Sequence, residues 1–296
     1  MITDKYGRKW FKANLHTHTT DSDGQKSPEE AMRLYKDAGY DILAITDHWS
    51  CSEAQDFEGM LILRGCEYHT FTREMSHIVG VGMKNVPWPD KKADPQDIVN
   101  EINDCGGAAI LAHPAWSLNT PTFIAGLEGI VGCEIYNSVS GYPYSAREYS
   151  GNVMDLASVI TKKAIPAIGA DDTHYYKDEL FRGFTYICME SLTRENVLKA
   201  LKEGNFIASQ GPFAFIEREK DESGEYAVVY CDDSVTNDSA AAVQFFSANY
   251  WNRDTTTVFA EEITEKKARF KIKPNDVFIR AEVRTDDGRF AWMNLK

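Results

Sequence analysis

The sequence predicts an α/β fold, with a parallel sheet or barrel over residues 1–209 and a small antiparallel β domain over residues 210–296. Two patterns predict this fold. In the first part, short apolar runs alternate with segments that are bounded like helices, and repeated strand–helix units are typical of parallel sheets. From about Gly211 onward, apolar and polar residues alternate in short segments between turn signals such as Asp287-Gly288, which indicates antiparallel strands.

The helices of the first part have readable ends. Ser27, Pro28 and Glu30 offer an N-cap, a proline in the first turn and a capping-box glutamate, and Gly39 ends this helix. Asp94-Pro95 begins a second helix, which Gly106 ends. Two further helices are expected over residues 145–163 and 193–203.

The strands expected in the first part cover residues 11–15, 42–46, 61–63, 78–81, 108–112, 130–136, 165–168 and 184–189. In the second part they cover residues 213–217, 226–230, 243–247, 257–260, 268–272, 278–283 and 289–292. No helix is expected in the second part. We interpret it as a sandwich-like unit that packs on the first domain.

Composition limits the possible partners. The 296-residue chain has a formal net charge of -13, so it should repel a polyanion, and extended nucleic acid is not an expected partner. Residues 1–10 are charged and lack the apolar stretch of a signal peptide, and no run is long and apolar enough to span a bilayer, so no membrane partner is expected. The six cysteines are scattered without a CxxC pair and are interpreted as core residues in a reducing compartment. We therefore expect a cytoplasmic enzyme with a small-molecule substrate.

The histidines have an uneven distribution, because all seven precede residue 175. Five predicted strands run directly into imidazole or carboxylate groups, and the carboxyl ends of parallel strands share one face of a barrel. His77 is the exception, since it precedes its apolar run; either that strand runs in another direction or His77 approaches the site from a loop. The groups that follow the five strands are His16, His18 and Asp23; Asp47 and His48; Glu67 and His69; His113; and Asp172 and His174.

Imidazole and carboxylate without thiolate suit zinc, manganese or iron. His16 and His18, two residues apart on an extended segment, project to the same side and can bind one ion. The ligand count is too high for one tetrahedral ion, and clusters of two or three ions generate hydroxide near neutral pH. A single histidine at a strand end is more often structural, but five such strand ends together favour a metal-dependent hydrolase. His69 is either a ligand or a residue that supports one.

The ordered motifs resemble those of the polymerase and histidinol phosphatase (PHP) superfamily. The residues that carry the resemblance are Leu15-His16-Thr17-His18 with Asp23, Ile45-Thr46-Asp47-His48, Gly65-Cys66-Glu67, His77, His113-Pro114 and Asp172-Thr173-His174. Residues 283–294 also resemble the β extension of some stand-alone members, although more weakly. The resemblance implies a distorted, TIM-like barrel of seven strands with a site for three metal ions.

The resemblance also implies a role for individual residues. One ion would bind His16, His18, Glu67 and Asp172; a second would bind Glu67, His77 and His113, with Glu67 bridging; a third would bind Asp23, His48 and His174. Asp23 stands where many relatives have histidine. The expected cofactors are two or three divalent ions of manganese, iron or zinc.

The activity that the resemblance implies is hydrolysis of a small phosphoester by a metal-bridging hydroxide. Asp172, Glu67 and Asp47 are the expected catalytic residues, with Asp47 orienting ligands or handling a proton. The candidate substrate-binding residues are Arg147, Arg182, Asn137 and Tyr142.

Two alternatives remain open at the level of sequence. The same metal site could hydrolyse a carbamate, an amide or a carboxyl ester. Alternatively, the chain could be a subunit whose metals are structural and whose β domain binds a partner. Asp172 and both histidines of His16-Thr17-His18 are intact, which argues against the second alternative because an inactive relative usually loses ligands.

Overall fold

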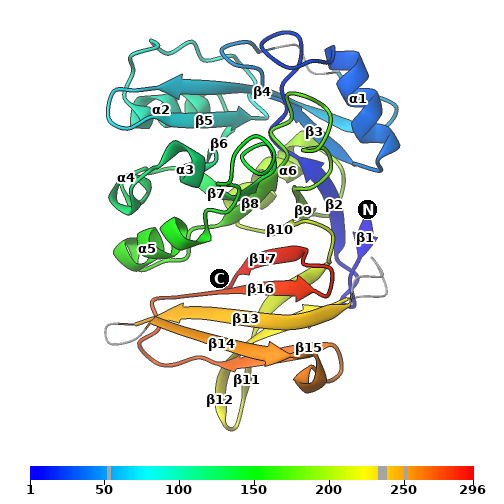
Figure 1. Cartoon of the computed structure of the whole chain (residues 1–296), viewed down its shortest axis with the longest axis vertical. Helices are drawn as coiled ribbons and strands as arrows, with labels where there is room; N and C mark the ends of the chain where they lie inside the picture. Colours follow the sequence, from blue (N-terminus) through cyan, green and yellow to red (C-terminus); the bar gives the residue numbers. More distant parts are fainter. Residues whose placement is uncertain (52–54, 233–238, 250–252) are drawn as a thin grey trace.

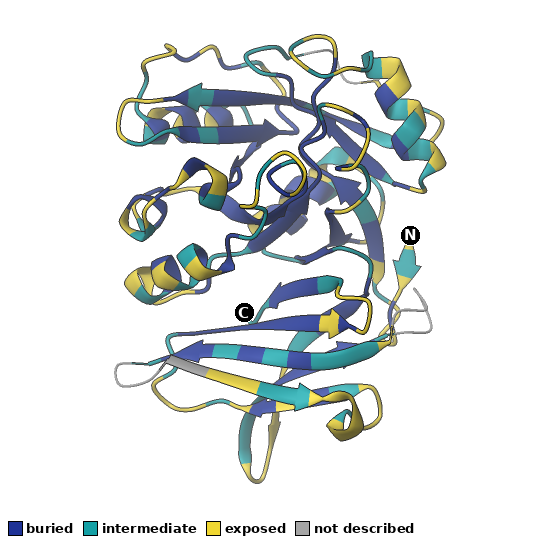
Figure 2. Ribbon diagram, viewed as in Figure 1, coloured by how far each residue is buried: buried dark blue, intermediate teal, exposed yellow. Residues whose placement is uncertain are grey.

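A computed structural model describes residues 1–51, 55–232, 239–249 and 253–296 (Figure 1). The predicted α/β fold is confirmed, with helices that lie outside a large, mostly buried sheet (Figure 2). The strands of the first part are β1 (Ile2–Thr3), β2 (Lys9–Asn14), β3 (Ile42–Ile45), β4 (Leu61–Thr70), β5 (Ser76–Val81), β6 (Ala108–Leu111), β7 (Ile130–Asn137), β8 (Ala167–Ala170), β9 (Phe184–Cys188) and β10 (Phe206–Ser209).

The central strands follow the order β9-β2-β3-β4-β5-β6-β7-β8. β2, β3 and β4 are parallel, as are β6, β7 and β8, whereas β5 runs antiparallel to both of its neighbours. The predicted TIM-like barrel is not confirmed, because within the described residues no ladder joins β8 to β2 or β9 and the sheet is not closed. A single parallel bridge between Thr17 and Thr173 spans this gap.

Helix ends agree with the capping chemistry of the sequence. The Ser27 side chain accepts from the Glu30 amide and the Glu30 carboxylate accepts from the Ser27 amide, so the capping box is formed. The helices are α1 (Pro28–Asp37), α2 (Pro95–Asp104), α3 (Pro114–Ser117), α4 (Pro121–Ala125), α5 (Gly151–Thr161) and α6 (Arg194–Lys202). α5 is shorter than predicted, since residues 145–150 form a loop, and the short helices α3 and α4 were not predicted.

The second part consists almost entirely of strands. They are β11 (Ala214–Asp221), β12 (Gly224–Cys231), β13 (Ala240–Ala248), β14 (Arg253–Phe259), β15 (Lys267–Lys271), β16 (Phe278–Thr285) and β17 (Phe290–Asn294), with a 3₁₀ turn at Ala260–Glu262. β17 pairs with β10, so the central sheet continues through β17, β16, β13 and β14. The separate sheet β11-β12-β15 packs on this extension, as the stacked rings of Phe245 and Phe270 show. The predicted domain boundary at residues 209/210 falls directly after β10 and stays a prediction.

The short central strands form a rigid base for the loops above them. Every residue of β3, β6 and β8 is buried, and these strands consist of small and aliphatic side chains. Such strands, buried on both faces, are typical of sheets that helices cover. Among the described residues, no helix has the length and apolar character needed to cross a membrane.

Candidate metal centre and its cavity

The predicted ligands meet at one edge of the sheet. His16, His48, His113 and Asp172 follow the ends of β2, β3, β6 and β8, while Glu67 lies within β4. His77, the exception in the sequence pattern, stands near the start of β5, whose direction is opposite to that of its neighbours, as one of the two alternatives for this histidine predicted. Because β5 is antiparallel to β4, its first residues lie at the edge where the parallel strands end.

The first ligand group is a compact tetrahedron of four buried atoms. These atoms are Nε2 of His16, Nε2 of His18, Oε2 of Glu67 and Oδ1 of Asp172. Five of the six distances between them are 3.1–3.2 Å. A near-regular tetrahedron of this size has its centre about 2 Å from each corner, close to the roughly 2.0–2.2 Å at which zinc binds nitrogen and oxygen.

The burial of this group indicates what belongs at its centre. Asp172 Oδ1 is buried and makes no hydrogen bond of good geometry, although the two imidazole nitrogens lie 3.1 Å away. Buried carboxylate oxygens without such a bond are costly unless they bind a cation. The four atoms therefore fit a divalent metal ion.

Glu67 also faces a second group through its other oxygen. Its Oε1 lies 2.7 Å from His77 Nδ1 and 3.5 Å from His113 Nε2. His48 Nδ1 lies 3.2 Å from Oε2, and His48, Glu67 and His77 form a further set of close ligand atoms. The two oxygens of one carboxylate thus point into two adjacent ligand groups, the arrangement that a bridging carboxylate requires.

The third group is more open to solvent. Asp23 Oδ2 lies 3.5 Å from His174 Nε2 and 3.8 Å from His48 Nε2, and Asp23 Oδ1 lies 3.5 Å from His18 Nδ1. The Asp23 side chain is 53% exposed. All nine predicted ligands therefore lie in one cluster, and the assignment of ions to them stays a prediction.

The loop that carries Asp23 is held by Asp47 and by a close backbone approach. Asp47 accepts hydrogen bonds from the amide and hydroxyl of Thr19 at 2.7 and 2.6 Å and from the Ser22 hydroxyl at 2.6 Å. A Cβ on Gly24 would lie 2.4 Å from the His18 carbonyl oxygen, so only glycine lets the loop fold back here. The structure places Asp47 behind this loop, and its predicted catalytic role stays untested.

Electrostatics in the cluster couple its histidines to its carboxylates. Burial lowers the pKa of His18, but the adjoining carboxylates of Asp172 and Glu67 outweigh this effect and raise it to about 9. Burial raises the pKa of Asp172, and its histidine neighbours reverse this shift and hold it well below its usual range. A metal ion that binds here must displace the protons of these imidazoles.

Glu134, which the sequence pattern did not single out, organises the cluster. This β7 residue is 1% exposed. Its Oε1 lies 2.8 Å from His16 Nδ1, and its Oε2 accepts from the His113 amide at 2.9 Å and from Asn137 Nδ2 at 2.7 Å. A carboxylate on Nδ1 fixes a histidine with its Nε2 lone pair free for a metal. The available signal was one charged residue inside an otherwise apolar strand.

Two of the ligand residues have backbone conformations that are rare for side-chain-bearing residues. Asp172 has φ 53° and His113 has φ 29°. The Asp172 amide donates to the His16 carbonyl at 3.0 Å, and Asn137 Nδ2 donates to Asp172 Oδ2 at 3.0 Å. Strained backbone that neighbouring groups hold in place is common at functional sites.

His69 lies beside the cluster and belongs to none of its three ligand groups. Its Nδ1 is 3.3 Å from His48 Nδ1, and the two rings meet at 77°. It packs against Trp49 on another side. His69 therefore contacts the candidate ligand His48 without belonging to a ligand group itself.

A cavity of about 360 Å³ opens onto the cluster. Among the described residues, no lysine or arginine lines it. Trp116 packs edge-on to His77 and His113, and the rings of Tyr144 and Tyr175 stack at 4.4 Å. The lining residues are Asp23, His48, Glu67, His77, His113, Trp116, Val139, Ser140, Tyr144, Ser145, Asp172, His174 and Tyr175.

The four predicted substrate-binding residues are not part of this lining. Arg147 and Arg182 are exposed, and Tyr142 is 83% exposed. Asn137 is 1% exposed, and its amide group bonds to Glu134, Asp172 and Ser140. The structure therefore places Asn137 as a support for Asp172. The side chains of the other three residues face solvent and are absent from the cavity lining.

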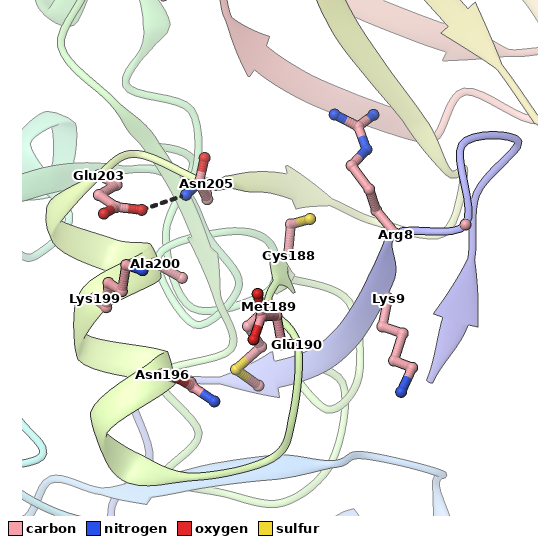
Figure 3. A pocket seen from close by; sticks show the side chains of 11 residues that line it. Arg8, Lys9, Cys188, Met189, Glu190, Asn196, Lys199, Ala200, Glu203 and Asn205 are labelled. Atoms are coloured by element: carbon pink, nitrogen blue, oxygen red, sulfur yellow. Dashed lines mark hydrogen bonds between the residues drawn. The ribbon is translucent and has the colours of Figure 1, made fainter.

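A second cavity, of about 490 Å³, lies at the opposite end of the central strands (Figure 3). Lys9 at the start of β2, Cys188 at the end of β9 and residues of α6 line it. It contains none of the nine ligand candidates. The cavity of about 360 Å³ is therefore the candidate site, because ligand candidates line it, although the other cavity is larger.

No protein-family model matches the chain. The uncharacterized protein MJ1587 of Methanocaldococcus jannaschii is 28% identical over 150 residues, which cover 43% of this chain and 82% of that protein. An amidohydrolase from Chromobacterium violaceum, solved with bound sulfate and no metal, has a TM-score of 0.41 at 17% identity, covering 56% of this chain and 89% of that one.

A similar fold is found in a two-domain protein containing a predicted PHP-like metal-dependent phosphoesterase from Bacteroides vulgatus. The TM-score is 0.57 at 17% identity, with 100% of this chain and 98% of that chain covered. The likeness includes the second part as well as the first. This chain thus shares the fold of that protein over its whole length, which agrees with the resemblance that the sequence motifs carry.

Proposed function

We propose that the chain is a metal-dependent phosphoesterase that acts on a small phosphorylated molecule with two or three ions of manganese, iron or zinc. The observation that carries the proposal is the buried tetrahedron of His16, His18, Glu67 and Asp172, which shares Glu67 with a second ligand group. Ions bound at such sites supply hydroxide near neutral pH and neutralise developing negative charge.

The residues of the chain prepare the site for this chemistry. Glu134 holds His16 with its Nε2 lone pair toward the cluster, and Asn137 fixes Asp172. The cavity of about 360 Å³ accommodates a small molecule. Phosphate recognition rests on the ions, because the lining offers three carboxylates and no lysine or arginine among the described residues.

This charge balance gives a first test of the proposal. Asp23, Glu67 and Asp172 repel a phosphate dianion unless bound cations compensate them. Inorganic phosphate should therefore bind the metal-loaded protein and not the metal-free protein, as measured by isothermal titration calorimetry.

The decisive experiment compares substrates after metal reconstitution. The protein is depleted with a chelator, reloaded with Mn²⁺, Zn²⁺ or Fe²⁺, and assayed with the p-nitrophenyl derivatives of phosphate, acetate and a carbamate. The phosphate should be hydrolysed, and Asp172→Asn should reduce kcat by at least about 100-fold, since loss of a ligand exceeds the effect of losing its support. Asp178→Asn, at an exposed position six residues away, serves as the matched control.

A second candidate is hydrolysis of an uncharged carbamate, amide or carboxyl ester at the same metal site. The observation that favours it is the aromatic lining of Trp116, Tyr144 and Tyr175 without a basic residue for phosphate among the described residues. Rapid turnover of the acetate or the carbamate with no turnover of the phosphate would replace the first proposal by this one.

A further inference from the structure

One wall of the metal cavity is formed by residues 138–148, which we name the cavity-wall segment. Val139, Ser140, Tyr144 and Ser145 of this segment line the cavity. Backbone hydrogen bonds join the two ends of the segment. The backbone amide of Asn137 donates to the Glu148 carbonyl at 2.9 Å, and the backbone amide of Ser150 donates to the Ile135 carbonyl at 2.9 Å. The position of the wall therefore depends on what holds these ends.

The start of the segment is held by the first part of the chain, at the end of β8. The Ser138 amide donates to the Ala170 carbonyl and the Val139 amide to the Asp171 carbonyl, both at 3.0 Å. The end of the segment makes a different set of contacts. Tyr149, the next residue, contacts the second part of the chain, residues 210–296, which we call the β domain.

Tyr149 is seated between three elements. Its ring lies 6.3 Å from that of Trp292 on β17, and its hydroxyl donates to the Glu282 carboxylate on β16. The ring also covers Gly151, since a Cβ on that glycine would lie 2.0 Å from the Tyr149 hydroxyl oxygen. Glycine at position 151 thus makes room for this side chain.

A buried arginine completes the contact. Arg280, also on β16, has 4% of its side chain exposed and donates to Asp155 of α5 through Nε at 2.5 Å and Nη2 at 2.7 Å. Its Nη1 donates to Glu282 at 2.5 Å and its Nη2 to the Tyr149 hydroxyl at 3.2 Å. One strand of the β domain therefore holds both Tyr149 and the first turns of the helix that follows it.

The chemistry of this network favours one exact arrangement. The Arg280 guanidinium donates to two carboxylates and a hydroxyl. All of these hydrogen bonds form together only when Tyr149, Asp155 and β16 hold their observed relative positions. Buried polar networks whose members are all satisfied rigidify the elements that they join.

We propose that the β domain positions the substrate cavity, with Glu282 and Arg280 acting through Tyr149 on the cavity-wall segment. The effect on substrate rests on the proposed function, whereas the effect on the segment does not. Glu282 and Arg280 are positioning residues, because they lie outside the cavity lining.

The test uses the metal-loaded full chain and two substitutions. Tyr149→Phe removes the hydroxyl, and Glu282→Gln keeps the shape of the acceptor while removing its charge. The backbone amides of Arg147 and Ser150 donate to the carbonyls of Ser140 and Ile135, each at 2.9 Å. Hydrogen–deuterium exchange should accelerate about tenfold at these two amides, the change expected for loss of one hydrogen bond to a charged group. Exchange over residues 167–174 and the metal content should stay at the parental values.

Steady-state kinetics with p-nitrophenyl phosphate add a second readout. KM should rise about tenfold in both variants while kcat stays within about threefold, because the wall shifts and the metal ligands do not. Tyr6→Phe and Glu222→Gln, at exposed positions, are the matched controls.

Each outcome decides a separate claim. Parental exchange rates in both variants would overturn the proposal. Faster exchange with parental KM in an active enzyme would overturn the link to substrate. Faster exchange in a chain that hydrolyses no phosphoester would support the positioning role and overturn the proposed function instead.

Discussion

Glu134→Gln is the perturbation that tests the organisation of the cluster most directly. The glutamate accepts from three donors, two of which meet at Oε2. If the glutamine oxygen replaces Oε2, its NH₂ group faces His16 Nδ1, and the imidazole must then carry its proton on Nε2, the atom that faces the other ligands. If the amide is reversed, its NH₂ group opposes the His113 amide and Asn137 Nδ2.

Either orientation weakens the tetrahedral group. A hydrogen bond to a charged group contributes about 1.5–3 kcal/mol, and about 1.4 kcal/mol corresponds to a factor of ten. Metal affinity should therefore fall about 10- to 100-fold, the range that is usual for loss of a carboxylate behind a histidine ligand.

The assay is competition between the protein and a chromogenic chelator, with Mn²⁺ or Zn²⁺ as the metal. Glu128→Gln, an exposed glutamate in the loop before the same strand, is the matched control and should bind like the parent. A Glu134→Gln protein with an affinity within threefold of the parent would refute the argument that Glu134 sets the protonation of His16.

Three other changes test the remaining features. Glu67→Gln should lose metal from both groups that share this carboxylate while melting close to the parent in chelator, because the strands below are aliphatic; full metal content by mass spectrometry would contradict the shared role. His174→Ala should lower the metal content by one equivalent, and loss of all metal would show that the ligand groups are not separate. In metal-free protein, the raised pKa of His18, about 9 against an ordinary 6.5, provides stability that is complete below about pH 6.5 and is lost as the pH rises through 9. The Tm in chelator should therefore fall between pH 6.5 and pH 9, and a flat profile over that range would be inconsistent with the burial of His18 between two carboxylates.

The cluster could be predicted from the sequence because most of its residues directly follow the ends of strands. A strand ends where its apolar run ends, and parallel strands end at the same edge, so His16, His48 and His113 could be placed together without coordinates. His77 could not be placed in this way, since the direction of β5 depends on its pairing with β4 and β6.

The features that the sequence did not predict depend on tertiary contacts. Glu134 lies inside an apolar run, and its partners are 118 residues away at His16 and 21 residues away at His113. Arg147 and Arg182 have the charge that phosphate binding needs, but loop conformation decides whether a charged side chain faces a cavity. Closure of the barrel depends on the path of the whole sheet, which single strands do not encode.

The pairing of β10 with β17 has a consequence for handling the protein. All four residues of β10 are buried, and β17 covers the outer edge of this strand. A fragment cut near residue 209 would expose that apolar edge with its backbone groups unpaired, and open edges of this kind recruit other chains. It would also lose Trp292, which stacks on Tyr136 at 5.6 Å. We therefore expect such a fragment to aggregate on expression, so that a minimal fragment that carries the ligand cluster has to retain the last strand.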